Sequence, residues 1–390
     1  MQLIRLGTTG PAAAEVRAAL SVLGLLPVRP AASHAGSPGS GGASASVSLD
    51  DAVFDADCDA AVREFQQRRG LSVDGIVGPE TYRALDEARH RLGDRVLLHS
   101  LTHPYVGDDV VALQERLLEL GYNAGRADGV FGPQTAAALT AFQRETGLVP
   151  DGTFGPATMR VFRQLGRKVV GGRPHRLREA EVIHRRGPTL IGKAVVVDAG
   201  HGGADRGVTV EGVEEASIVA DLAARLEGRL TAAGMTAYLS HAPGTMRSDA
   251  ERAAFANATD ADLLICLHVD GADSPRPQGV ATYHFGTGSG ASSTMGERLA
   301  SLVQREVVAR TGLLDCRVHP KTWEILRRTA MPAVRLELGY LTNAGDRSLL
   351  VDPSFRDTVA EAILVAVQRL YLPAELDPPT GQFRLPALVG

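Results

Sequence analysis

Cysteine and aromatic residues are scarce in this chain of 390 residues. It has three cysteines, one tryptophan and 5% aromatic residues. Cys58, Cys266 and Cys316 are odd in number and far apart, which argues against a disulfide framework and fits reduced thiols. Cysteine metal sites usually use close pairs, so we expect each cysteine to be a small buried apolar residue.

Long apolar runs and a strong charge of one sign are also missing. No stretch approaches the ~20 apolar residues that span a bilayer. Glu15 and Arg17 interrupt the N-terminal segment before it reaches the length of a secretion signal. The net charge of −4 gives no electrostatic reason to expect nucleic acid as a partner. We therefore predict a cytoplasmic protein with no nucleic-acid partner and no transmembrane segment.

The first half contains an internal repeat. FQQRRGLSVDGIVGPET at 65–81 aligns with FQRETGLVPDGTFGPAT at 142–158, an offset of 77, whereas Leu23-Gly24 aligns with Leu120-Gly121 at an offset of 97. The difference of 20 residues indicates a Gly/Ser/Ala/Pro-rich insertion at about 30–48. Helical spacing and Asp-Gly turns predict two small all-α repeats of about three helices each, at 1–92 and 93–166.

The second half has a different pattern. A basic linker at 167–191 precedes a domain at 192–372, and a tail follows at 373–390. Within the domain, β-rich apolar runs at 194–200, 262–269 and 333–341 alternate with amphipathic helical segments. This alternation predicts an α/β domain with a twisted sheet flanked by helices.

Polar side chains follow these runs, where ligands and catalytic groups gather in such sheets. His201 follows the first run, His268 closes the second, and Glu337 lies toward the end of the third, while Glu215 stands at the start of a long helix. Two imidazoles and a carboxylate with an open fourth position are typical of a catalytic zinc site. The glycines around His201 would let the backbone turn sharply beside the metal.

Each of these residues also has a plain structural explanation. His201 could be a loop histidine, and His268 could be a hydrogen-bonded core histidine on the face of its strand. Glu215 could be a helix N-terminal charge, and Glu337 could form an ion pair with Arg335 on the same strand face. The joint occurrence of these residues at four suitably placed elements favours the site.

The FQ…GL..DG..G..T pattern, with its upstream helix, resembles the peptidoglycan-binding domain built from a three-helix repeat. The resemblance implies that both repeats bind a wall polymer or its precursors, with protein–protein contact as the alternative. The motifs VVVDAGHGGADRG, ADLLICLHVD and PAVRLELGYLTN resemble the zinc-dependent N-acetylmuramoyl-L-alanine amidases of the amidase_3 type.

The amidase resemblance implies residue roles. His201, Glu215 and His268 would hold Zn²⁺, and Glu337 would be the catalytic carboxylate. The register of the following helix favours Glu215 over Glu214 as the ligand.

Three further positions bear on the site. Asp198 is the natural candidate to orient a ligand histidine. His241 stands where the family usually has arginine, and Asp270 stands where it usually has asparagine, so we expect substrate contacts that differ from those of the family.

The implied function is zinc-dependent hydrolysis of the amide between N-acetylmuramic acid and L-alanine, in peptidoglycan fragments or precursors bound by the repeats and the amidase cleft. The architecture also resembles leaderless actinobacterial regulators of peptidoglycan synthesis. The alternative is therefore a non-secreted, precursor-sensing regulator with little or no turnover, whose partner would be a cytoplasmic cell-wall synthesis protein. An extracellular location would require an unconventional export route.

Overall fold

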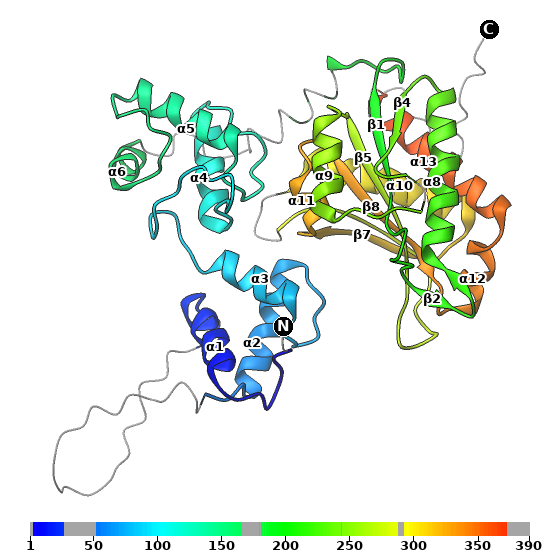
Figure 1. Cartoon of the computed structure of the whole chain (residues 1–390), viewed down its shortest axis with the longest axis horizontal. Coiled ribbons are helices and arrows are strands. Elements are labelled where there is room, and N and C mark those ends of the chain that lie inside the picture. The colour runs from blue at the N-terminus through cyan, green and yellow to red at the C-terminus, as the bar shows by residue number, and fades with distance from the viewer. Residues whose placement is uncertain are drawn as a thin grey trace, which may run out of the picture. The chain divides into compact units, whose positions relative to one another are not determined.

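A computed structural model describes residues 3–26, 52–165, 179, 181, 183, 185–242, 244–287 and 292–372 (Figure 1). The chain divides into two compact units, Met1–Gly171 and Gly172–Gly390, each described by itself below. The predicted insertion at 30–48, the tail at 373–390 and most of the linker at 167–191 lie outside the described residues. None of the helices in these described ranges combines the length and the apolar character needed to cross a membrane.

The first unit contains two helical repeats, each with its own hydrophobic core. The helices of the first repeat are α1 (Pro11–Val22), α2 (Ala56–Arg69) and α3 (Pro79–Ala88), and those of the second are α4 (Asp108–Glu119), α5 (Pro133–Glu145) and α6 (Pro156–Gln164). Helices α3, α5 and α6 each begin at a proline that follows a glycine, because a missing N–H costs nothing in the first helical turn. The predicted all-α repeats are thus confirmed.

A buried glutamine organises each of three helix–turn segments. The Gln66 amide nitrogen donates to Asp74 Oδ1 at 2.7 Å and to Thr81 Oγ1 at 3.2 Å, and its carbonyl oxygen accepts from Gly75 N at 2.9 Å. The same three bonds recur around two other glutamines, as Gln114 with Asp128, Thr135 and Gly129, and as Gln143 with Asp151, Thr158 and Gly152. Every amide is therefore hydrogen-bonded inside the fold, as buried polar groups usually are.

The first repeat has an ionic variant of this network on the two sides of the insertion. Arg17, which aligns with Gln114 at the offset of 97, donates to Val53 O at 3.1 Å and pairs with Asp55 at 2.8 Å. Its Nη1 also lies 2.9 Å from the sulfur of Cys58, which aligns with Thr135 at the offset of 77. Burial raises the pKa of the Cys58 thiol to about 11, so this cysteine is a packed and unreactive one.

The second unit is built on a six-stranded mixed sheet in the order β4-β1-β5-β8-β6-β7. Its strands are β1 (Ala194–Ala199), β4 (Thr236–Leu239), β5 (Leu263–Asp270), β6 (Val280–Phe285), β7 (Asp315–Lys321) and β8 (Ala333–Tyr340). Strands β4, β1, β5 and β8 are parallel, and β6 runs antiparallel to β8. A short hairpin, β2 (Thr209–Val210) and β3 (Val213–Glu214), follows β1.

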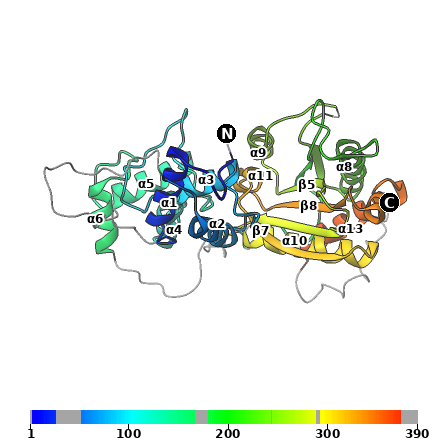
Figure 2. The same ribbon diagram turned by 90° about the horizontal axis from the view of Figure 1, so that it is seen from below.

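Helices cover both faces of this sheet, as predicted. Figure 2 shows α9 and α11 on the opposite side from α10 and α13. The larger core lies under α8 (Glu215–Ala232), α10 (Thr294–Thr311) and α13 (Pro353–Tyr371), and the smaller one under α9 (Asp249–Ala258) and α11 (Glu324–Arg328). Helix α12 (Ala344–Leu350) packs beside the end of β8. Leu222, Leu226 and Leu230 recur every four residues along α8 and are buried in the larger core.

Candidate metal site

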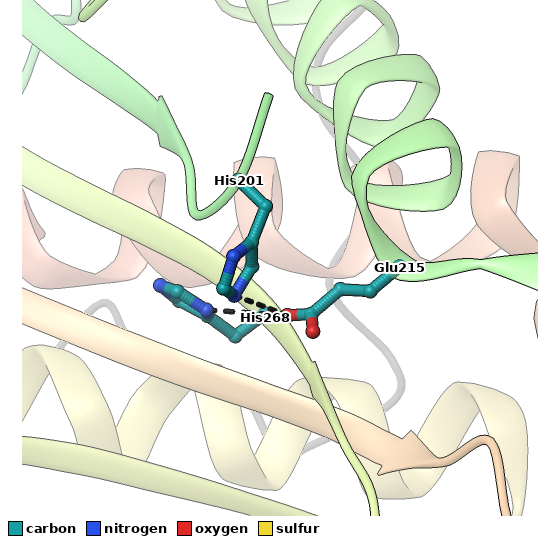
Figure 3. Close-up of side chains that lie close together, drawn as sticks. All are labelled: His201, Glu215 and His268. Atoms are coloured by element: carbon teal, nitrogen blue, oxygen red, sulfur yellow. Dashed lines mark hydrogen bonds and ion pairs between the residues drawn. The ribbon is translucent and has the colours of Figure 1, made fainter. Parts of the chain in front are cut away.

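The carboxyl ends of β1 and β5 bring three predicted side chains together. His201 lies in the loop that follows β1, His268 is near the end of β5, and Glu215 is the first residue of α8. Their ligand atoms all lie within 4.8 Å of one another, and Figure 3 shows the two imidazoles converging on the carboxylate. Because β1 and β5 are parallel neighbours, residues distant in sequence meet at this edge of the sheet.

Glu215 is the centre of the cluster. Its Oε1 lies 3.3 Å from His201 Nε2 and 3.2 Å from His268 Nδ1, and it accepts a bond from Val269 N at 3.0 Å. Its Oε2 accepts from Val208 N at 3.0 Å. Burial works to raise the pKa of Glu215, but the bonds from both histidines and both backbone N–H groups outweigh it and hold the pKa well below its ordinary value. The carboxylate is therefore anionic at neutral pH.

His268 is a neutral imidazole. Burial, with repulsion from Arg335, lowers its pKa to about 3, against the attraction of Glu215. Its Nε2 is buried and has no hydrogen-bond partner among the described residues. A buried polar atom left without a partner costs about 1–3 kcal/mol, so such atoms are rare unless a site uses them. A neutral imidazole is the form that binds a metal, and Nδ1 is the nitrogen of His268 that faces Glu215.

Asp205, rather than Asp198, orients a histidine of the cluster. The Oδ2 atom of Asp205 lies 2.8 Å from His201 Nδ1. The prediction for Asp198 is wrong: its side chain bonds Ser240 and Arg252 on the sheet face under α9. Asp198 pairs with Cys266 of β5 and so lies on the sheet face of His268 but farther from the strand ends, where Ser240 and Arg252 hold its carboxylate. The sequence did hold a signal, because Asp205 lies four residues after His201 in the same glycine-rich stretch.

The glycines of this stretch make room for the cluster. A Cβ atom at Gly200 would lie 1.9 Å from the His268 ring, and one at Gly207 would lie 2.5 Å from Glu215 Oε2. At Gly202, a Cβ would lie 2.2 Å from the backbone oxygen of Thr245. A side chain at any of these positions would therefore displace a ligand candidate or the facing loop.

Glu337 stands on β8 directly opposite His268 of β5. Arg335 contacts Glu337 Oε1 with two nitrogens. Its Nε donates a hydrogen bond to this oxygen at 2.7 Å, and its Nη2 lies 2.6 Å from it. The ion pair expected as the plain alternative is thus present, and it lies beside the cluster. Burial raises the pKa of Glu337 to about 7 although Arg335 acts to lower it. A carboxyl group that titrates near neutrality can both accept and donate a proton.

The other predicted positions lie around the cluster. Glu214 pairs with Arg206, so the structure brings Glu215 and not Glu214 to the histidines. The His241 ring nitrogen Nε2 lies 2.8 Å from Ala199 O, and the ring lines a pocket of about 240 Å³ that also borders His201. Asp270 accepts from Gly271 N at 2.7 Å where β5 ends.

Comparison with known proteins agrees with this architecture. The chain matches the N-acetylmuramoyl-L-alanine amidase family over residues 195–369 and the peptidoglycan binding domain over 9–85 and 106–162. It is 49% identical to the N-acetylmuramoyl-L-alanine amidase CwlM of Mycobacterium tuberculosis over 390 residues, 99% of this chain and 94% of that protein. The amidase LytC of Bacillus subtilis is 33% identical over 174 residues, 45% of this chain and 34% of LytC.

Among solved structures, the N-acetylmuramoyl-L-alanine amidase of Clostridium difficile 630 matches this chain with 26% identity and a TM-score of 0.43. The match covers 46% of this chain and 96% of the amidase chain.

These matches place the chain first among the hydrolases that cleave amide bonds. More particularly, it belongs to the N-acetylmuramoyl-L-alanine amidase family, and it carries the peptidoglycan binding domain as well. The family resemblance drawn from the sequence motifs is thereby confirmed.

Proposed function

We propose that this protein is a zinc-dependent hydrolase of the amide between N-acetylmuramic acid and L-alanine. The observation that carries the proposal is the convergence of His201, Glu215 and His268, with ligand atoms within 4.8 Å. Three protein ligands that leave an open position are the usual composition of a catalytic zinc site. The family membership supplies the reaction class.

The residues present fit zinc on several counts. His268 is neutral and turns its Nδ1 toward Glu215, Glu215 is anionic, and Asp205 fixes the ring of His201. Zinc bound there would supply a Lewis acid that polarises the scissile carbonyl and lowers the pKa of water.

The protein's own residues would move the protons. Glu337 takes a proton from the attacking water and gives it to the nitrogen of the departing L-alanine, and a carboxyl pKa near 7 suits both transfers. Arg335 holds one oxygen of this carboxylate and leaves Oε2 for the reaction. The repeats would hold the wall polymer or precursor near the hydrolase unit.

A regulator with little turnover is the second candidate, and the Arg335–Glu337 ion pair favours it. Arg335 opposes the burial that raises the pKa of Glu337 and occupies one of its oxygens, so the pair works against Glu337 as a base. In this role the protein would bind a peptidoglycan precursor and act on a cell-wall synthesis protein in the cytoplasm. The cytoplasmic location stays a prediction, which cell fractionation with an antibody would check.

Hydrolysis of purified muropeptides tests the first candidate. Wild-type protein with zinc should release peptide, a chelator should stop release, and H201A and E337Q should be inactive. Intact muropeptides and precursors after incubation with zinc-loaded wild type would refute the hydrolase and leave the regulator.

A further inference from the structure

Next to Glu337, the sheet carries a group of cationic and aromatic side chains, and one of them, Arg335, is the ion-pair partner of Glu337. We call this group the cation–aromatic patch, and it consists of Tyr283, His319, Lys321, Trp323 and Arg335. Strand register aligns three of them in one row, since Arg335 of β8 is opposite Tyr283 of β6, and Tyr283 is opposite His319 of β7. The adjacent row contains His268 and Glu337, so the patch adjoins the candidate site.

Ring contacts hold the patch together. The Arg335 guanidinium lies 4.3 Å from the centre of the Trp323 ring, and the Tyr283 ring lies 4.7 Å from the same indole. The Lys321 ammonium lies 5.7 Å from Trp323, and His319 lies 5.7 Å from Tyr283. His319 is exposed, and the other four are half-buried. The patch is therefore a preformed surface that a ligand can reach.

Arg335 has a hydrogen-bond donor to spare. Arg335 uses Nε and Nη2 on a single oxygen of Glu337, and no hydrogen bond within the described part of the chain engages its Nη1. A guanidinium has five N–H donors in a planar fork. The nearby carboxylate of Glu324 is already paired with Arg328 at 2.9 Å. An anion placed on the patch would thus meet the Arg335 guanidinium beside flat ring surfaces, in the positive field of the Lys321 ammonium near Trp323.

The chemistry of the substrate determines which anion this is. The lactyl carboxyl of muramic acid is consumed in the amide that the proposed reaction cleaves, and the sugar hydroxyl and acetamido groups are uncharged. Carboxylates on such a substrate therefore belong to its peptide. Charge-assisted bonds from Arg335 would distinguish a carboxylate from its neutral amide.

The geometry points to a subsite for an acidic peptide: the cation–aromatic patch binds a carboxylate of the peptide beyond the scissile bond, with Arg335 and Lys321 as the residues that determine specificity. This inference rests on the proposed function for the identity of the peptide. The subsite would give the protein a preference for a peptide carboxylate over the neutral amide, which the metal cluster alone does not provide.

Trp323 makes the subsite directly observable, because it is the only tryptophan in the chain. Full-length protein is titrated with L-alanyl-D-glutamate and with the same dipeptide amidated at both carboxyl groups, and tryptophan emission and calorimetric heat are recorded. The acid should change the emission and bind at least about tenfold more tightly than the diamide, because a hydrogen bond to a charged group gives that much discrimination.

Variants locate the effect. R335Q should remove most of the preference for the acid, and K321Q should weaken acid binding about threefold or more without affecting the diamide. R229Q removes an arginine that pairs with Asp357 under the opposite face of the sheet and should bind both dipeptides like wild type. If R335Q does not fold, the loss of acid binding in K321Q tests the subsite.

Equal affinity for acid and diamide, heat without an emission change, or no binding of the acid would each overturn the subsite. So would R335Q and K321Q that bind the acid like wild type. Peptide release from intact muropeptides, measured on the same preparations, reports separately on the proposed hydrolysis.

Discussion

Both units of this protein bury polar side chains, but they treat them differently. In the helical repeats, Gln66, Gln114 and Gln143 have amides whose donors and acceptors bond within the fold. In the sheet unit, buried His268 keeps a nitrogen without a partner in the described residues, beside an anionic Glu215. A network whose hydrogen bonds are all made stabilises a fold. A buried polar atom without a partner costs free energy that other parts of the fold must offset, and such an atom therefore indicates a function.

The largest expected effect is on proton transfer by Glu337. E337Q keeps the shape of the side chain and removes its ability to accept a proton, so hydrolysis should fall about 10²–10⁴-fold. Metal content should stay near wild type, whereas the unfolding temperature should fall because the buried pair with Arg335 loses its negative charge. E214Q, which alters a surface partner of Arg206, is the matched control and should keep full activity. An E337Q enzyme with wild-type turnover would remove Glu337 from the mechanism.

The next effect separates two aspartates. D205N removes the negative charge beside His201 Nδ1 and should weaken metal binding about 10–100-fold, as changes to the groups that orient ligands do. D198N alters the buried pair with Arg252 and should lower the free energy of unfolding while the folded protein keeps its metal affinity. Competition with a chelator of known affinity measures both. The reverse assignment of effects would restore Asp198 as the orienting residue.

A smaller effect should follow from disrupting a satisfied network. Q143A leaves Gly152 N and Asp151 without their buried partner and should cost about 1–3 kcal/mol of unfolding free energy. Gln134 is exposed on the same helix, so Q134A should stay within about 0.5 kcal/mol of wild type. Urea unfolding followed by circular dichroism checks both variants. Equal stabilities would mean that the glutamine networks contribute nothing measurable.

The smallest effect concerns the ionic variant in the first repeat. R17Q introduces the residue type of the aligned Gln114 and removes a half-exposed ion pair with Asp55. The free energy of unfolding should fall by at most about 1 kcal/mol. Adding C58T, which restores the aligned threonine, should recover part of that loss. Urea unfolding of the single and double variants tests this, and additive losses in the double variant would contradict it.

Sequence patterns predicted the repeats, the α/β class and the three converging residues, because strand ends and helix starts mark such sites. The glutamine network around Gln114 was missed, since its glutamine and aspartate are 14 residues apart in the sequence. In the other two networks this separation is 8 residues. Asp205 was missed because loop geometry decides which carboxylate reaches His201. The cation–aromatic patch could not be predicted, since it depends on β6 running antiparallel to β8.

The central claim is that His201, Glu215 and His268 form a metal site, and metal stoichiometry tests it most directly. Wild type and H201A are purified in parallel, incubated with zinc, freed of excess metal and analysed by elemental mass spectrometry. The account predicts about one zinc per wild-type chain and a large loss in H201A. Folded wild-type protein that retains no zinc, or H201A that retains as much as wild type, would contradict it.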